Sequence, residues 1–358
     1  MVEIRKSISG INKYAPSKTT EEVTKQYGLS PADIIKLGAN ENPLGPSPKA
    51  VQAVREYADA ISMYPSADAI ELRAALSKYT GYPTEQIVAG NGMDGVIDIT
   101  TRLFVEKGDE AIILPPTFSY YELFTLMCSG IPRFVPRKSN FDIDVDALID
   151  NITKKTKVIF LCSPNNPTGN VIGEKELLQV LDATDAVVLV DEAYVEFADS
   201  SAIELVRECE NLVVTRTMSK AFGLAGLRVG YGIVPPWIFK EYMKVLPAFS
   251  VNHIGIVAGI AALEDKEHLQ STIQTVKKGR AYLIKNIPFK TYPSQANFVL
   301  VDVSPLSAEK VCEALMKKGV IVRDCSSVRG AGKSLIRVSV GTSDENRRVV
   351  GALREVAP

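Results

Sequence analysis

The sequence predicts an α/β protein, with a large domain built on a mostly parallel central sheet covered by helices and a small α+β domain after it. From about residue 87, short β-branched apolar runs alternate with helical or loop segments, which is typical of a parallel sheet with helices on both faces. After Pro236 this alternation stops and a mostly helical stretch begins. The 358 residues suffice for one large and one small domain.

The predicted elements follow in chain order. Residues 1–38 are expected to form an N-terminal arm, residues 39–236 the large domain, and residues 237–358 an interdomain helix and the small domain. The strands of the large domain are predicted at 86–89, 111–114, 158–161, 186–190 and 212–215. The small domain is expected to have strands at 297–301, 320–323 and 335–339, and helices near 307–318 and 344–355.

Composition excludes several classes of protein. A net charge of −1 produces no positive electrostatic potential that would attract nucleic acid or an anionic membrane. A small-molecule partner is therefore expected. The five cysteines form no Cys-x-x-Cys pair and the chain has two histidines, so neither a metal site nor a disulfide framework is expected. The first residues lack an apolar leader and no apolar run approaches a membrane span, which predicts a cytoplasmic protein.

Polar or glycine-rich residues follow each of the five predicted strands of the large domain. Ligands of open α/β sheets bind at the carboxyl ends of the strands, so these segments are expected to form one concave site. They are residues 90–95, 115–118, 163–169, 191–194 and 217–220.

The first of these segments, Gly90-x-Gly92-x-x-Gly95, fits the dinucleotide-binding fingerprint and keeps an NAD-dependent dehydrogenase as a remote alternative. The acidic residue expected about 20 positions later would be Asp109 or Glu110, yet both precede the next strand. Backbone N–H groups of a glycine turn at a helix N-terminus hold any phosphate. The segment is therefore interpreted as a phosphate cradle, with a purely structural turn as the alternative.

Two charged residues at strand ends indicate the chemistry. Asp191 follows five apolar residues, and a buried carboxylate is costly without a cationic or donor partner. A protonated pyridine nitrogen is such a partner; a metal ion or a helix cap would be others. Lys220 follows an apolar strand and precedes Arg228 by eight residues, and burial beside a cation lowers the pKa of an amine and frees a nucleophile.

Three motifs resemble those of the fold-type I, pyridoxal-phosphate-dependent aminotransferases. They are Asn165–Gly169, Asp191–Tyr194 and Ser219-Lys220-x7-Arg228, in this order. Within this superfamily the chain most resembles the histidinol-phosphate aminotransferases, from about Tyr14 to the C-terminus, through residues 40–48, 194–197, 220–228 and 336–342.

The resemblance implies pyridoxal 5′-phosphate as cofactor and a role for each matched residue. The large domain, residues 39–236, would bind the cofactor, and the small domain within residues 237–358 would close over the substrate. Lys220 would form the Schiff base and transfer the proton, and Asp191 would pair with the ring nitrogen. Asn166 and Tyr194 would bind the phenolic oxygen, and Phe118 would stack on the ring, with Tyr121 as its rival. The cofactor phosphate would be held by Gly92, Met93, Asp94, Thr217, Ser219 and Arg228, and by Tyr64 from the partner subunit of a homodimer.

The substrate is expected to bind Arg337, with Arg323, Tyr14 and Asn42 nearby, since a guanidinium accepts both carboxylate and phosphate. The implied reaction transfers an amino group between L-histidinol phosphate and 2-oxoglutarate, giving 3-(imidazol-4-yl)-2-oxopropyl phosphate and L-glutamate in histidine biosynthesis. The alternatives are a threonine-phosphate decarboxylase and an aromatic amino acid aminotransferase.

Met63 and Gly95 depart from the family pattern, and residues 328–333 are hypothesised to form a mobile rim over the substrate phosphate.

Overall fold

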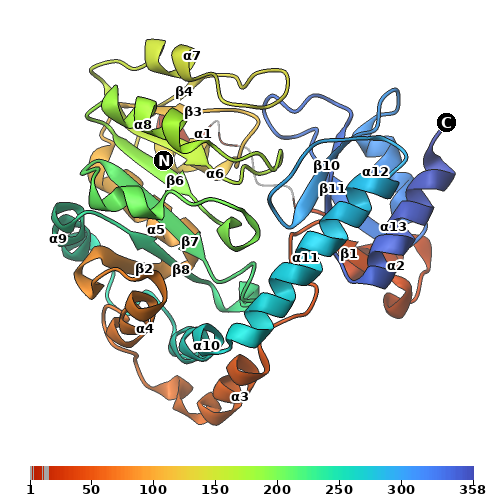
Figure 1. Ribbon diagram of the computed structural model, residues 1–358, viewed down its shortest axis with the longest axis horizontal. Helices are drawn as coiled ribbons and strands as arrows, with labels where there is room; N and C mark the ends of the chain where they lie inside the picture. Colours follow the sequence, from red (N-terminus) through yellow and green to blue (C-terminus); the bar gives the residue numbers. More distant parts are fainter. Residues whose placement is uncertain (1, 3, 10, 12–15) are drawn as a thin grey trace.

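The computed structural model describes residues 2, 4–9, 11 and 16–358, which form two sheets in opposite halves of the molecule (Figure 1). The larger sheet has seven strands in the order β2-β8-β7-β6-β5-β3-β4, and the smaller has five in the order β1-β11-β12-β10-β9. The long helix α11 (Lys266–Asn286) leads from the half with the larger sheet to the half with the smaller one.

The larger sheet confirms the predicted fold class. Strands β7, β6, β5, β3 and β4 run parallel, and β8 is antiparallel to both of its neighbours. Every residue of β6 is buried, because helices cover both faces of the sheet. The strands are β2 Ile87–Asn91, β3 Glu110–Ile113, β4 Ile131–Phe134, β5 Thr156–Cys162, β6 Val187–Asp191, β7 Leu212–Thr217 and β8 Val229–Ile233.

Two strands of this sheet were not among the predicted ones. Strand β4 contains a proline and an arginine and lies at the edge of the sheet, where a missing N–H is tolerated. Strand β8 contains Gly230 and Gly232, and glycine weakens the pattern by which a strand is recognised. Gly230 is required by packing, because a Cβ atom there would lie 2.0 Å from the backbone nitrogen of Met93.

The smaller sheet includes a strand from the N-terminal part of the chain. Strand β1 (Ile35–Leu37), which falls within the predicted arm, pairs in parallel with β11, with Ile35 opposite Val320. The other pairings are antiparallel. The remaining strands are β9 Lys290–Thr291, β10 Phe298–Asp302, β11 Val320–Asp324 and β12 Leu335–Ser339.

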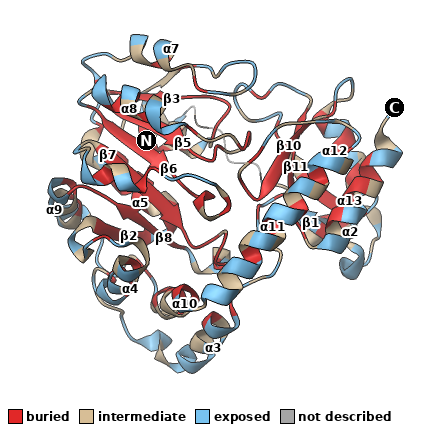
Figure 2. Cartoon of the chain, in the orientation of Figure 1, coloured by how far each residue is buried: buried red, intermediate tan, exposed pale blue. Residues whose placement is uncertain are grey.

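The helices surround the sheets with their apolar sides inward, and Figure 2 shows buried strands beneath helices whose outer faces are exposed. Helix α10 packs beside α3 and α4 of the larger half and α9 packs beside α5, although α9 begins at the predicted boundary and α10 lies after it. The division at residues 38 and 236 stays a prediction. Besides α11, the helices are α1 Lys6–Ser9, α2 Thr20–Tyr27, α3 Pro48–Glu56, α4 Ile70–Thr80, α5 Gly92–Phe104, α6 Tyr120–Met127, α7 Val145–Asp150, α8 Glu174–Asp182, α9 Pro236–Val245, α10 His253–Glu264, α12 Ala308–Met316 and α13 Ser343–Val356. Within the described residues, none of these helices is both long and apolar enough to cross a membrane.

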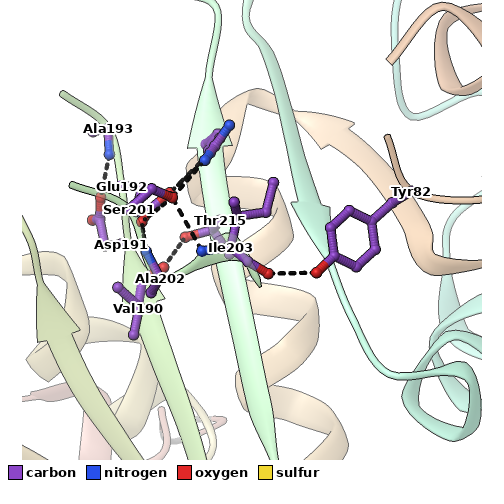
Figure 3. A network of polar contacts seen from close by, with 10 residues as sticks. Tyr82, Val190, Asp191, Glu192, Ala193, Ser201, Ala202, Ile203 and Thr215 are labelled. Atoms are coloured by element: carbon purple, nitrogen blue, oxygen red, sulfur yellow. Dashed lines mark hydrogen bonds and ion pairs between the residues drawn. The ribbon is translucent and has the colours of Figure 1, made fainter. Parts of the chain in front are cut away.

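A buried ion pair joins the carboxyl ends of β6 and β7 (Figure 3). Arg216 Nε donates to Glu192 Oε2 over 2.9 Å, and Glu192 Oε1 accepts from the backbone N–H of Ala202 over 2.6 Å. Ser201 Oγ donates to the same carboxylate over 2.8 Å. Successive side chains of an extended chain point to opposite sides. The side chain of Asp191 therefore points away from the network that binds its neighbour Glu192.

Replacing Arg216 by methionine should lower the free energy of unfolding by about 3–5 kcal/mol, because the carboxylate of Glu192 would stay buried without its cation. Urea unfolding of the apoprotein measures the change. The matched control is Arg102→Met, since Arg102 forms an exposed pair with Asp98 and its removal should change stability by less than about 1 kcal/mol. Equal effects of the two substitutions would contradict the prediction.

Candidate active site

A cavity of about 360 Å³ lies at the carboxyl ends of the strands of the larger sheet and reaches the smaller sheet. This is the size of a typical small-molecule site. The structure brings eleven of the predicted site residues to its wall, namely Met93, Asp94, Phe118, Asn166, Asp191, Tyr194, Thr217, Ser219, Lys220, Arg228 and Arg337. Gly92 directly precedes Met93 at the first position of α5.

Asp191 ends β6 at the buried side of the cavity, where 2% of it is exposed. Its Oδ2 accepts a hydrogen bond from the Tyr121 hydroxyl over 2.5 Å, and its Oδ1 accepts from the backbone N–H of Ala193 over 3.0 Å. Burial raises the pKa of Asp191 to about 6, although both donors oppose this shift. A cationic N–H in the cavity would stabilise the charged carboxylate.

Lys220 extends into the cavity just after β7. Its Nζ donates to the backbone oxygen of Ala39 over 3.1 Å. Burial lowers the pKa of Lys220 to about 8, and the nearby guanidinium groups of Arg337 and Arg228 contribute in the same direction. A neutral, nucleophilic amine is therefore accessible close to neutral pH.

One end of the cavity is formed by the N-terminus of α5. Gly92 has a φ of +70°, and a Cβ atom at this position would lie 2.5 Å from the Arg228 guanidinium. Arg228 itself has a φ of 53° and pairs with Asp94 over 2.8 Å. A side chain at position 92 would thus fill the space between the helix N-terminus and the arginine, where an anion fits.

Two hydroxyl groups after β7 lie at this same end. Thr217 Oγ1 and Ser219 Oγ are 3.0 Å apart, and the backbone N–H of Ser219 donates to Thr217 Oγ1 over 3.1 Å. Hydroxyls, backbone N–H groups and a guanidinium together match the three acceptor oxygens of a phosphate.

The other end of the cavity joins the two sheets. Arg337, on β12 of the smaller sheet, donates from Nη1 to Asn166 Oδ1 and from Nη2 to the backbone oxygen of Gly38, the latter over 2.7 Å. Tyr194 Oη accepts from Asn40 Nδ2 over 3.0 Å. Burial raises the pKa of Tyr194 above its usual range, so its hydroxyl keeps its proton.

Of the two aromatic residues considered for stacking, Phe118 lies at the cavity wall. Its ring is stacked on that of Tyr120, with the centroids 5.2 Å apart and the planes 8° apart. Tyr121 is fully buried behind it, stacked on Phe160 and bonded to Asp191. Phe118 is thus placed for contact with a ligand, and Tyr121 for support of Asp191.

Besides Gly92, three predicted residues that the structure describes are not among those that line the cavity. Tyr64 is 81% exposed and stacks on Phe249, with ring centroids 4.6 Å apart. Asn42 donates to the backbone oxygen of Ala221, the residue after Lys220, over 2.9 Å. Arg323 lies opposite Arg337 on the neighbouring strand β11. Tyr14 lies outside the described residues, and the roles of all four stay predictions.

The segment 328–333 contacts the larger half of the molecule. Arg329 donates to Glu122 of α6 over 2.9 Å and lies over the ring of Phe134, with its Cζ 4.1 Å from the ring centroid. No residue of the segment is among those that line the cavity. The hypothesis of a rim over the substrate stays a prediction.

Several residues at the cavity wall were not predicted. They are Lys36, Gly38, Ala39, Asn40, Cys162, Ala193, Ala225, Ile321 and residues 16–19. Asn40 belongs to the recognised segment 40–48, so its role in the site could have been suspected. Its φ of 54° is a conformation that asparagine tolerates better than most residues. The residues outside the recognised motifs reach the site through tertiary contacts that no local pattern reveals.

The groups around the cavity fit pyridoxal 5′-phosphate. A lysine amine of lowered pKa suits the aldehyde, a buried carboxylate suits a protonated ring nitrogen, and the glycine cradle at α5 with Arg228 suits the phosphate. In the described part of the chain, no group of three or more histidine, cysteine or acidic side chains is arranged to hold a metal ion.

The chain is similar to known aminotransferases over nearly its whole length. The family model for aminotransferases of class I and II matches residues 32–353. The histidinol-phosphate aminotransferase of Methanosarcina barkeri is 58% identical over 98% of this chain and 96% of that protein, and that of Methanosarcina mazei is 55% identical over 98% and 95%. The crystal structure of histidinol-phosphate aminotransferase from Sinorhizobium meliloti in complex with pyridoxal-5′-phosphate superposes with a TM-score of 0.89, with 26% identity and coverage of 100% of this chain and 98% of that one. The chain therefore belongs to the histidinol-phosphate aminotransferase family, within the aminotransferases of class I and II.

Proposed function

We propose that the protein is a pyridoxal-phosphate-dependent transaminase that moves an amino group between L-histidinol phosphate and 2-oxoglutarate, in the biosynthesis of histidine. The products are 3-(imidazol-4-yl)-2-oxopropyl phosphate and L-glutamate. The observation that carries the proposal is that one cavity brings together the amine of Lys220, the carboxylate of Asp191 and the guanidinium of Arg337.

Each of these groups has a chemical task. The bound cofactor supplies an electron sink for the electrons released when the substrate Cα–H bond breaks. Lys220 holds the cofactor through its aldehyde carbon and then moves the proton from and to the substrate Cα. Asp191 keeps the ring nitrogen protonated, and Asn166 and Tyr194 bind the phenolic oxygen. The N-terminus of α5, with Thr217, Ser219 and Arg228, holds the phosphate.

Arg337 is proposed to bind the anionic end of both substrates. It is 8% exposed and lies at the cavity wall, where its charge can face a ligand. A planar guanidinium suits the carboxylate of glutamate and the phosphate of histidinol phosphate alike. Arg323, Tyr14 and Asn42 complete the proposed substrate site.

The comparison of three substrates tests the proposal. Purified holoenzyme should transfer the amino group of L-histidinol phosphate to 2-oxoglutarate with a kcat/KM well above that for phenylalanine. Threonine phosphate should release no carbon dioxide. Preference for phenylalanine would favour the aromatic aminotransferase, and carbon dioxide release would favour the decarboxylase. A colourless protein that binds NAD would overturn the cofactor assignment.

Replacing Arg337 by alanine should lower kcat/KM for L-histidinol phosphate by about 10²-fold or more, because the proposed charge pair between the guanidinium at the cavity wall and the substrate anion is lost. Lys36→Ala is the matched control, since Lys36 is a cation at the same cavity wall to which no role is assigned. Turnover of histidinol phosphate that is unchanged in Arg337→Ala would remove Arg337 from the anion site.

The active enzyme is proposed to be a cytoplasmic homodimer in which Tyr64 reaches the cofactor phosphate of the partner subunit. An exposed apolar patch supports this proposal, formed by Ile61, Met63, Tyr64 and Phe249, which are 72%, 61%, 81% and 42% exposed. Contiguous exposed apolar side chains of this kind are typical of interfaces.

A mixing experiment tests the shared site. The variants Tyr64→Ala and Lys220→Ala are each expected to have low activity alone. If each site uses one residue from each subunit, refolding the two together recovers activity, because one of the two sites in a mixed dimer has both residues intact. A monomer in sedimentation equilibrium, or no recovery from a verified mixed dimer, would contradict the shared site.

A further inference from the structure

The segment Gly38–Asn40 runs between the smaller sheet and the cavity, directly after β1. The backbone oxygen of Asn40 accepts from Asn297 Nδ2 over 3.0 Å, and its backbone N–H donates to Ser339 Oγ over 2.9 Å. Both partners flank strands of the smaller sheet or belong to them. Asn40 is 1% exposed, so its position is fixed by the smaller sheet rather than by solvent.

The side chain of Asn40 uses both of its polar atoms. Ser339 Oγ donates to Asn40 Oδ1 over 2.9 Å, while Asn40 Nδ2 donates to Tyr194 Oη over 3.0 Å. The Ser339 hydroxyl has one proton, which it donates to Asn40 Oδ1, and its oxygen accepts from the backbone N–H of Asn40. This arrangement turns the amide oxygen toward Ser339 and the amide N–H toward Tyr194.

The contact determines where the Tyr194 proton can go. A hydroxyl has one proton, and an oxygen that accepts from Asn40 keeps that proton for another acceptor. Tyr194 lines the cavity near Lys220, Arg337 and Asp191. Lys220 and Arg337 are donors when charged, and the two carboxylate oxygens of Asp191 already accept from Tyr121 and Ala193. The hydroxyl proton is therefore available to an acceptor on a bound ligand.

We propose that Asn40 is a positioning residue, whose side-chain amide binds the Tyr194 hydroxyl as an acceptor and so directs the hydroxyl proton toward the phenolic oxygen of the bound cofactor. Ser339 holds the amide in this orientation, so the smaller sheet acts on the cofactor through Asn40. The inference rests on the proposed role of Tyr194 and extends it to Asn40, a residue at the cavity wall that acts through the Tyr194 hydroxyl.

The test is the pH titration of the visible absorbance of the bound cofactor, without substrate. Asn40→Gly removes the amide, and glycine adopts the φ of 54° without strain. Asn40→Asp keeps the shape but has only acceptors when charged, and it would draw the Tyr194 proton away from the cavity. In Asn40→Gly the hydroxyl proton of Tyr194 is no longer directed at the phenolic oxygen, and in Asn40→Asp it is drawn away from it. The phenolic oxygen then becomes more basic, so the midpoint of the titration should rise by about 0.5–1 pH unit in Asn40→Gly, and further in Asn40→Asp.

A variant that lacks the Tyr194 hydroxyl shows whether Asn40 acts through this hydroxyl. Tyr194→Phe alone should raise the midpoint, and adding Asn40→Gly to it should cause no further rise, since the two residues act in one chain of hydrogen bonds. Where the Asn40 variants fail to fold, Ser339→Ala replaces them, because it removes the group that orients the amide and should raise the midpoint as well.

Asn211→Asp is the structural control. The Asn211 amide donates to the backbone oxygen of Thr184 over 2.9 Å, at the opposite end of β7, so its loss should lower stability and leave the midpoint unchanged. An unchanged midpoint in Asn40→Gly, or an equal rise with and without the Tyr194 hydroxyl, would overturn the inference. A wild-type protein without any pH-dependent cofactor band would instead overturn the proposed function.

Discussion

Replacing Lys220 by alanine should lower transamination by about 10⁴-fold or more, because the variant loses both the nucleophile that holds the cofactor and the base that moves the proton. Borohydride reduction followed by mass spectrometry gives an independent readout. Wild-type protein should gain the mass of the cofactor on the peptide that contains residue 220, and the variant should gain none.

Two comparisons make the Lys220 prediction specific. Lys220→Arg keeps a positive charge in the cavity but has no nucleophilic amine, so it should be as inactive as the alanine variant. Lys36→Ala, at the same cavity wall, should still be labelled on residue 220. Labelling of another lysine in wild-type protein would exclude Lys220 as the attachment site.

The lowered pKa of Lys220 adds a pH dependence to this prediction. Because the neutral amine is the reactive form, the rate at which apoprotein captures the cofactor should rise with pH and level off above about 8. Stopped-flow absorbance measures this rate. A rate that still rises up to the usual pKa of an exposed lysine, about 10.4, would show that the cavity does not perturb the amine.

Replacing Asp191 by asparagine should lower kcat by about 10²–10⁴-fold while leaving the fold intact. The substitution removes the charge that pairs with the protonated ring nitrogen, and losing one partner of a buried ion pair costs about 3–5 kcal/mol. The amide keeps the shape of the side chain and an acceptor for the Tyr121 hydroxyl. The comparison of kcat with KM, together with the cofactor absorbance, measures the effect.

Tyr121→Phe is the graded comparison for Asp191. It removes one donor to the carboxylate and leaves the negative charge, so it should lower kcat far less than Asp191→Asn does. A reduction of kcat below about tenfold in Asp191→Asn would contradict the pairing of this carboxylate with the ring nitrogen.

Most of the larger sheet could be predicted from the sequence, and so could the part of the site at the carboxyl ends of its strands. The strand that ends at Asp191 is a continuous apolar run, and such a run followed by a charged residue indicates a buried strand ending at a site. Because parallel strands end at one edge of the sheet, local patterns at Asn166, Asp191 and Lys220 were enough to place these residues together.

The rest of the site depends on contacts that are distant in sequence. The pairing of β1 with β11 follows from register and burial in the folded sheet, and three residues of β-strand give no pattern of their own. The contacts of Asn40 with Tyr194 and Ser339 exist because of this pairing, so they could not be read from the segment alone. Residues 16–19 reach the cavity wall without any motif.

The pairing of Ile35 with Val320 also sets the order in which the enzyme can be completed during synthesis. Lys220, Asp191 and the phosphate cradle emerge from the ribosome before β11 and β12, and the larger sheet has all of its strands by residue 233. The segment that contains Ala39 and Asn40 has no sheet to join until β11 has been made. A nascent chain can thus fold most of the cofactor site early, while the contacts of Lys220 with Ala39 and of Tyr194 with Asn40 form only when the C-terminal strands arrive.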